Sequence, residues 1–251
     1  MTTVTEAPAT RRATPQWWRA LTYLAASYAY LITLWLWALV LPAVALIMFV
    51  INRNVDQVTA SGMAHTHHAA LWFPFSIAII LTVTYLPIHV GNGMTRRSFI
   101  KAAFAVNVGV GVANAGITTI ALLVERRIYD SLGWFHGSAT GTDTPVFNGG
   151  ILPYALGLAL LFTAGQLSGS LIGITYYRLG GIRGTLALPL TLLPLASVGL
   201  LSLDEISQWV PWGVQLGSTG GTGIAVLVLL AAAGTFHLLV RNVPIDSEDR
   251  S

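Results

Sequence analysis

The most restrictive feature of this sequence is a set of long apolar stretches in which no Asp, Glu, Lys or Arg occurs. A helix needs about 20 apolar residues to cross the hydrocarbon core of a bilayer, where a charge is costly. Charged residues make up 9% of the chain, against about 25% in an average soluble domain. The sequence therefore predicts an all-α, polytopic membrane protein with six transmembrane helices within residues 29–240. The six stretches are Leu31–Ile51, Ala69–Val90, Ala102–Val124, Ile151–Tyr177, Gly184–Leu203 and Gly220–Val240.

The 13 basic residues predict how these spans are oriented. Ten of them lie before the first span, in the second and fourth connections, or after the last span, and three lie in the other connections. Because cytoplasmic loops carry an excess of Lys and Arg, residues 1–14 and 241–251 are predicted to be cytoplasmic tails. The arginines form short clusters between apolar runs and no continuous basic face, which argues against nucleic-acid binding.

The chain before the first span predicts a helix of its own. The uncharged run Ala20–Asn52 has 33 residues, about 50 Å of helix, whereas the hydrocarbon core is about 30 Å thick. Residues 15–28 are therefore expected to form an amphipathic helix in the cytoplasmic interface, anchored by Trp17 and Trp18. The alternative is one long, tilted first span with an aromatic belt.

Two outer connections are expected to differ from each other. Residues 125–150 are polar and rich in Gly, Thr and Asp, so they predict an exposed extracellular loop. Between Glu205 and Arg241 there are 35 uncharged residues, of which one span uses about 20. The remainder, residues 204–219, predicts a short helix that re-enters the membrane or lies on its outer surface. Irregular backbone at membrane depth has to be buried in protein or line a cavity. The marker residues of this re-entrant segment are Trp209, Pro211 and Trp212.

The absence of charges inside the spans indicates what could drive transport if the protein is a transporter. Ion-coupled transporters usually place acids, bases or unwound helices near the midplane of the membrane. The chain also has no GxxxxGK[ST] phosphate-binding loop and no Cys. If the protein transports a substrate, the energy is expected to come from another protein. The chain itself is expected to be no enzyme and to bind no cofactor.

Three histidines precede the second span on the outer side: His65, His67 and His68. Imidazoles so close together could hold zinc or copper, which would make this a metal-linked membrane protein. A polar cap on the start of a helix is the other interpretation of the same residues.

Four glycines recur at multiples of four in the fourth span: Gly157, Gly165, Gly169 and Gly173. A stripe of small residues lets another helix approach closely. The partner helix could belong to the same chain or to a second copy.

The second connection, residues 91–101, carries the most informative motif. Two glycines end a helix, Thr95 can cap a new one, and three basic residues follow within seven positions. The pattern Gly93-Met94-Thr95-Arg96-Arg97-Ser98-Phe99 resembles the first cytoplasmic coupling segment of ABC-2-type permeases, which have the type V exporter fold. The six spans, the interfacial helix and the outer re-entrant segment extend this resemblance over nearly the whole chain.

The resemblance implies a subunit of an ATP-driven exporter in a bacterial plasma membrane. The permease would pair as a homodimer or heterodimer, and separate ATPase subunits would hold ATP and Mg. The residues expected to touch the ATPase are Gly93, Thr95, Arg96, Arg97 and Phe99. A large extracellular domain is not evident, which does not fit macrolide-pump or lipoprotein-type functions.

The resemblance also implies a substrate path at the dimer interface, lined by the first, second and fifth spans. Four aromatic residues could offer a surface for an amphiphilic, lipid-like or drug or peptide substrate: Tyr28, Tyr30, Trp35 and Trp37. Core or lipid-facing packing is the alternative for each of them. At the level of the whole protein, the alternative function is a non-transport accessory or sensor protein of the membrane.

Overall fold

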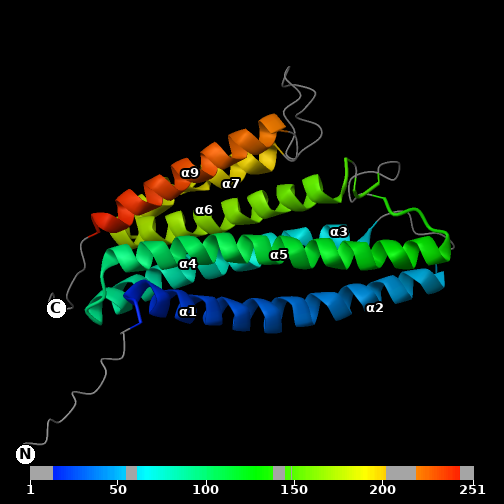
Figure 1. Cartoon of the computed structure of the whole chain (residues 1–251), viewed down its shortest axis with the longest axis horizontal. Coiled ribbons are helices and arrows are strands. Elements are labelled where there is room, and N and C mark those ends of the chain that lie inside the picture. The colour runs from blue at the N-terminus through cyan, green and yellow to red at the C-terminus, as the bar shows by residue number, and fades with distance from the viewer. Residues whose placement is uncertain (1–13, 55–60, 138–144, 148, 202–218, 244–251) are drawn as a thin grey trace, which may run out of the picture.

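Helices form nearly all of the structure, a computed structural model that describes residues 14–54, 61–137, 145–147, 149–201 and 219–243. Within these ranges no strand occurs. Five of the helices are long and apolar enough to cross a membrane. The helices lie side by side along one common axis (Figure 1). The predicted all-α fold is thus confirmed for the described residues, with several helices long and apolar enough to span a membrane, whereas the number six stays a prediction.

The first continuous helical rod of the bundle, residues 16–54, is longer than the sequence predicted. Helix α1 (Gln16–Tyr28) continues through a π-helical segment, Ala29–Trp37, into α2 (Ala38–Asn54). Helix α1 ends at Tyr28, the predicted boundary, but the chain stays helical beyond it, since Ala29 has helical angles of φ −58° and ψ −44°. No Gly or Pro follows Gln16 until Pro42, so nothing in this stretch ends a helix. In this respect the structure agrees with the alternative of one long first span.

The second and third rods form a hairpin. The short helix α3 (Gly62–His65) leads into α4 (His67–Gly91), which a tight turn joins to α5 (Arg96–Leu132). Helix α5 ends at Gly133, whose φ of 69° is accessible to glycine at little cost. The predicted extracellular loop 125–150 is therefore wrong in its first eight residues, which continue α5.

The last rods differ from prediction at their boundaries. Helix α6 (Ile151–Leu186) is kinked at Gly180, where φ is 73° and ψ is −173°. Helix α7 (Leu188–Leu200) has 13 residues and starts four residues later than the predicted fifth span. Helix α9 (Thr219–Arg241) covers the predicted sixth span. Residues 204–218 of the predicted re-entrant segment, with its marker residues Trp209, Pro211 and Trp212, lie outside the described residues.

Helix α6 lies at the centre of the bundle and packs against α4, α5, α7 and α9. Its glycine stripe faces α4 of the same chain. A Cβ atom on Gly169 would lie 2.5 Å from the Phe75 carbonyl oxygen, and one on Gly173 would lie 2.8 Å from the Ile79 oxygen. These glycines therefore serve close packing within the chain, which was one of the two interpretations of the stripe.

Candidate functional site

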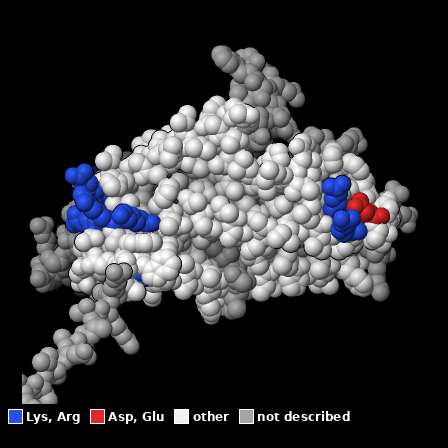
Figure 2. Space-filling model, in the orientation of Figure 1, with Lys and Arg blue, Asp and Glu red and all other residues white. Residues whose placement is uncertain are grey.

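Charged side chains gather at the two ends of the bundle, and an uncharged belt separates them (Figure 2). We call the end formed by the start of α1 and the α4–α5 turn the basic end, because every described charge there is Lys or Arg. The described ends of the chain also lie there, since Arg96 of the turn hydrogen-bonds to Arg241 and Thr95 to Gln16. The opposite end carries Arg126 and Arg127 beside acidic residues of α5. This separation is what the distribution of basic residues predicted.

The turn at the basic end is built by local signals in the sequence. Helix α4 ends at Gly91, and Gly93 turns the chain with a φ of 74°. The Thr95 side chain then accepts a hydrogen bond from the backbone N–H of Ser98 at 3.3 Å. The predicted helix cap at Thr95 is thereby confirmed.

Hydrogen bonds connect this turn to the ends of two other helices. The Arg96 guanidinium donates to the backbone oxygen of Arg241, the last residue of α9, at 3.1 Å. The backbone N–H of Thr95 donates to Oε1 of Gln16, the first residue of α1, at 3.2 Å. A displacement of the turn would therefore act on α1 and α9 as well as on α4 and α5.

The residues expected to contact an ATPase do not all lie at the surface. Gly93, Thr95 and Arg97 are exposed, and Arg96 is half-buried. Phe99 is only 2% exposed, and its ring centroid lies 5.7 Å from that of His89. Phe99 therefore belongs to the interior of the bundle and not to the exposed surface that the resemblance implied.

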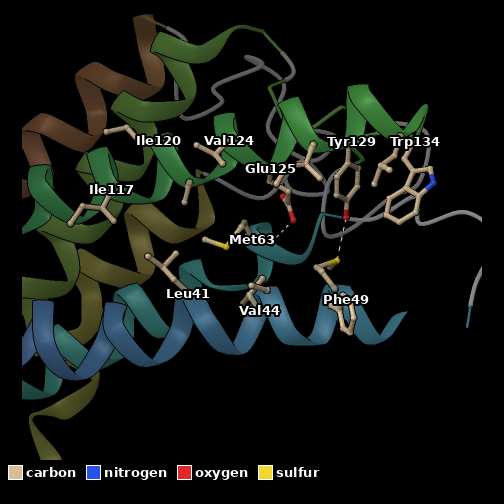
Figure 3. A pocket seen from close by; sticks show the side chains of 15 residues that line it. Leu41, Val44, Phe49, Met63, Ile117, Ile120, Val124, Glu125, Tyr129 and Trp134 are labelled. Carbon is tan, nitrogen blue, oxygen red and sulfur yellow. Dashed lines mark hydrogen bonds between the residues drawn. The ribbon is translucent and has the colours of Figure 1, made fainter. Parts of the chain in front are cut away.

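An apolar groove of about 590 Å³ lies between α2 and α5, toward the end opposite the turn. Helix α5 forms one wall and α2 the other, with Met63 of α3 between them (Figure 3). Glu125 lies at the groove and is the only ionisable residue among its lining residues other than Tyr129. The other lining residues are Leu41, Val44, Ala45, Met48, Phe49, Ile117, Ile120, Ala121, Val124, Ile128, Leu132 and Trp134.

The carboxylate of Glu125 is buried and fully engaged. Its Oε1 accepts from the backbone N–H groups of Gly62 and Met63 at 2.9 and 3.0 Å. Its Oε2 accepts from the Ser61 hydroxyl and lies 3.0 Å from His136 Nε2. Glu125 thus holds the first turn of α3 and the chain after α5 together.

Glu125 is not among the predicted site residues, because the polar stretch 125–150 predicts a loop that begins with it. A signal was present, since Glu125 falls three residues after Leu122 and four before Tyr129. That spacing places all three residues on one face of a helix, and all three are buried in the structure.

The four aromatic residues proposed for a substrate path do not form one surface. Tyr28 and Trp37 are buried at 3% and 4% exposure, whereas Tyr30 and Trp35 are exposed at 60% and 58%. The indole N–H of Trp37 donates to Oδ1 of Asn114 on α5 at 2.9 Å. Trp37 therefore acts as a link between the first rod and α5.

Replacing Trp37 by phenylalanine is expected to lower the free energy of unfolding by about 1 kcal/mol or somewhat more, because it leaves Asn114 Oδ1 without its donor. Thermal unfolding of the purified chain in detergent measures this change. Trp35→Phe is the matched control and should leave the unfolding temperature unchanged, since Trp35 is exposed. Equal effects of the two variants would contradict the role of this hydrogen bond.

The three histidines lie around the start of α4, and two of them contact the backbone. His65 Nδ1 lies 3.0 Å from the Ser61 oxygen, and His67 Nδ1 contacts the Ala64 oxygen. Among the described residues, no three His, Asp or Glu side chains are grouped so that they could hold a metal ion. Both imidazoles contact carbonyl oxygens of the preceding turn, and no side chain caps the start of α4, so the interpretation as a polar cap stays a prediction.

Of the helices predicted to line the substrate path, the fifth span lies apart from the first and second within one chain. Helix α7, the predicted fifth span, packs on α6 and α9. Helix α6 lies between α7 and the layer that contains α4 and α5 (Figure 1). A path lined by the first, second and fifth spans would therefore require a second subunit.

Comparison of the chain with protein-family models, with curated proteins and with solved structures finds no match.

Proposed function

We propose that this chain is the membrane-spanning subunit of a transporter driven by separate ATPase subunits that dock on its basic end. The observation that carries the proposal is the exposed, basic α4–α5 turn, which hydrogen bonds connect to the ends of α1 and α9. A partner that pulls on such a turn moves four helices together. ATP and Mg belong to the partner, and the membrane is the bacterial plasma membrane.

The distribution of charge supports an external energy source. Glu125 is the one acidic residue that lies at the described groove, and its carboxylate already has four partners in Ser61, Gly62, Met63 and His136. A carboxylate that carries protons or sodium ions through a transport cycle has to exchange partners with its substrate ion. Glu125 instead holds structural elements together, so the docked ATPase supplies the energy for transport.

The proposal includes the finer topology expected from the sequence. Helix α7 and the chain that follows it would complete a sixth crossing, with a re-entrant segment before α9 and both termini in the cytoplasm. A homodimer or heterodimer would bring α7 of one subunit next to the first rod of the other. An amphiphilic or lipid-like substrate, or an apolar drug or peptide, fits the apolar groove between α2 and α5, which offers little polar surface.

Arg97→Glu is expected to reduce capture of the ATPase by at least about tenfold, because it replaces an attractive charge at the docking surface by a repulsive one. The measurement is affinity purification of the tagged chain from its native membranes, followed by mass spectrometry and an ATP-hydrolysis assay. Arg97 is preferred to Arg96, whose guanidinium also bonds to Arg241 within the chain.

Arg126→Glu is the matched control, since Arg126 is an exposed arginine on the same helix at the opposite end. This variant should capture the ATPase as the unmodified chain does. If Arg97→Glu captures as much ATPase as Arg126→Glu, docking on the basic turn is excluded.

A further inference from the structure

A second feature of the basic end is a cleft of about 260 Å³ between the start of α1 and the first turns of α5. It lies beside the α4–α5 turn and is lined by polar, basic and aromatic side chains. The lining residues are Gln16, Trp17, Thr95, Arg97, Ser98 and Lys101.

The cleft contains two positive charges that no described residue neutralises. Arg97 and Lys101 are four residues apart on α5, so they lie on one face of the helix, and both are exposed. The one ion pair between described side chains joins His136 and Glu125 at the other end of the bundle. The Arg96 guanidinium, in contrast, already donates a hydrogen bond to the backbone oxygen of Arg241. The cleft is thus an anion-attracting site with donors that no described residue uses.

The position of the cleft along the bundle indicates where the anion comes from. The basic end begins where the uncharged belt stops (Figure 2), which is the depth of the lipid headgroups in a membrane. Trp17 lies in the cleft with 38% of its surface exposed, and tryptophan is enriched at that depth. Phosphate groups of lipids are the anions present there in the highest number.

A second, apolar groove of about 340 Å³ follows the same two helices from the cleft toward the membrane core. Its first residues are Leu21, four positions after Trp17, and Ala105, four positions after Lys101. Because residues four apart lie above one another on a helix, cleft and groove share the seam between α1 and α5. Ala25, Ala29 and Gly109 leave room along this seam. The combination has the shape of a headgroup site with a channel for an acyl chain.

We propose that this seam binds an anionic phospholipid, with the lipid phosphate between Arg97 and Lys101 and one acyl chain along α1 and α5. Basic pockets between membrane helices on the cytoplasmic side bind lipid headgroups in this way. A bound lipid would fix the first rod to α5 at the place where the turn is anchored. The site shares Arg97 with the proposed docking surface, but lipid binding needs no ATPase, so it can be tested in the absence of one.

The test uses the purified full chain in detergent, without any ATPase, and dioleoyl phosphatidylglycerol as the probe. Bound lipid is counted by native mass spectrometry, with zwitterionic dioleoyl phosphatidylcholine for comparison. Arg97→Gln combined with Lys101→Gln is expected to weaken binding of the anionic lipid about tenfold or more. Arg183→Gln, which removes an exposed arginine of α6 outside the cleft, should not change it.

A second variant tests the acyl-chain groove separately. Gly109 has no atom within 4 Å of a built Cβ, so Gly109→Phe is expected to fold and to block the groove while the basic cleft remains. It should weaken binding of the anionic lipid severalfold.

Three results would overturn the proposal. They are equal binding of both lipids to the unmodified chain, unchanged binding in the Arg97/Lys101 double variant, and unchanged binding in Gly109→Phe. Inorganic phosphate is also tested as a competitor of the anionic lipid. If it displaces the lipid completely at equal concentration, the cleft is a site for free phosphate and the lipid assignment is wrong.

Discussion

Gly169→Leu is expected to prevent α4 from packing on α6 and to leave no stable folded chain in detergent. A Cβ atom at this position would lie 2.5 Å from the Phe75 carbonyl oxygen and 3.0 Å from the Ala78 Cβ. The obstructing atoms belong to the backbone and to a short side chain, so no rotamer change relieves the clash. Overpacking by single methylenes already costs about 1–3 kcal/mol, and a whole leucine side chain at a backbone contact is expected to exceed that range.

The measurement for Gly169→Leu is the fraction of monodisperse protein after extraction, together with its unfolding temperature. Gly234→Leu is the matched control, because Gly234 lies within α9 and a Cβ there would meet nothing within 4 Å. The control should extract and unfold like the unmodified chain. A Gly169→Leu chain as stable as the Gly234→Leu chain would mean that α4 and α6 do not pack as described.

Glu125→Ala is expected to destabilise the end of the bundle opposite the turn by several kcal/mol, because each buried donor left without an acceptor costs about 1–3 kcal/mol. The substitution leaves His136, Ser61 and the backbone N–H groups of Gly62 and Met63 buried without their acceptor. Glu125→Gln keeps an oxygen for the two N–H groups and is expected to lose less.

Hydrogen exchange of the backbone amides of Gly62 and Met63 measures this loss of stability at the two residues themselves. Exchange should accelerate strongly in Glu125→Ala and less in Glu125→Gln. Asp130→Ala is the control, since Asp130 is exposed on the same helix and should leave both amides protected. Unchanged protection in Glu125→Ala would show that the carboxylate does not hold α3.

The parts of the fold that depend on neighbouring residues could be predicted from the sequence. The apolar runs predicted membrane-spanning helices, and Gly93 and Thr95 predicted the turn and the cap of α5. These features follow from local backbone preferences and from the length of apolar stretches, which a sequence displays directly.

The parts that depend on distant residues could not be predicted in the same way. Glu125 was placed in a loop because its partners, Ser61 and His136, are 64 and 11 residues away. The interior position of Phe99 follows from packing at the basic end of the bundle, which no local pattern reveals. Likewise, the glycines of α6 predicted a close helix approach, but only the structure identifies α4 as the partner.

The central claim is that a separate ATPase drives this chain, and purification of the unmodified, tagged chain from its native membranes tests it most directly. The account predicts that a polypeptide with a phosphate-binding loop co-purifies and that the preparation hydrolyses ATP. A folded chain that is recovered with neither a nucleotide-binding partner nor ATP hydrolysis would contradict the account. That result would favour a non-transport role in the membrane.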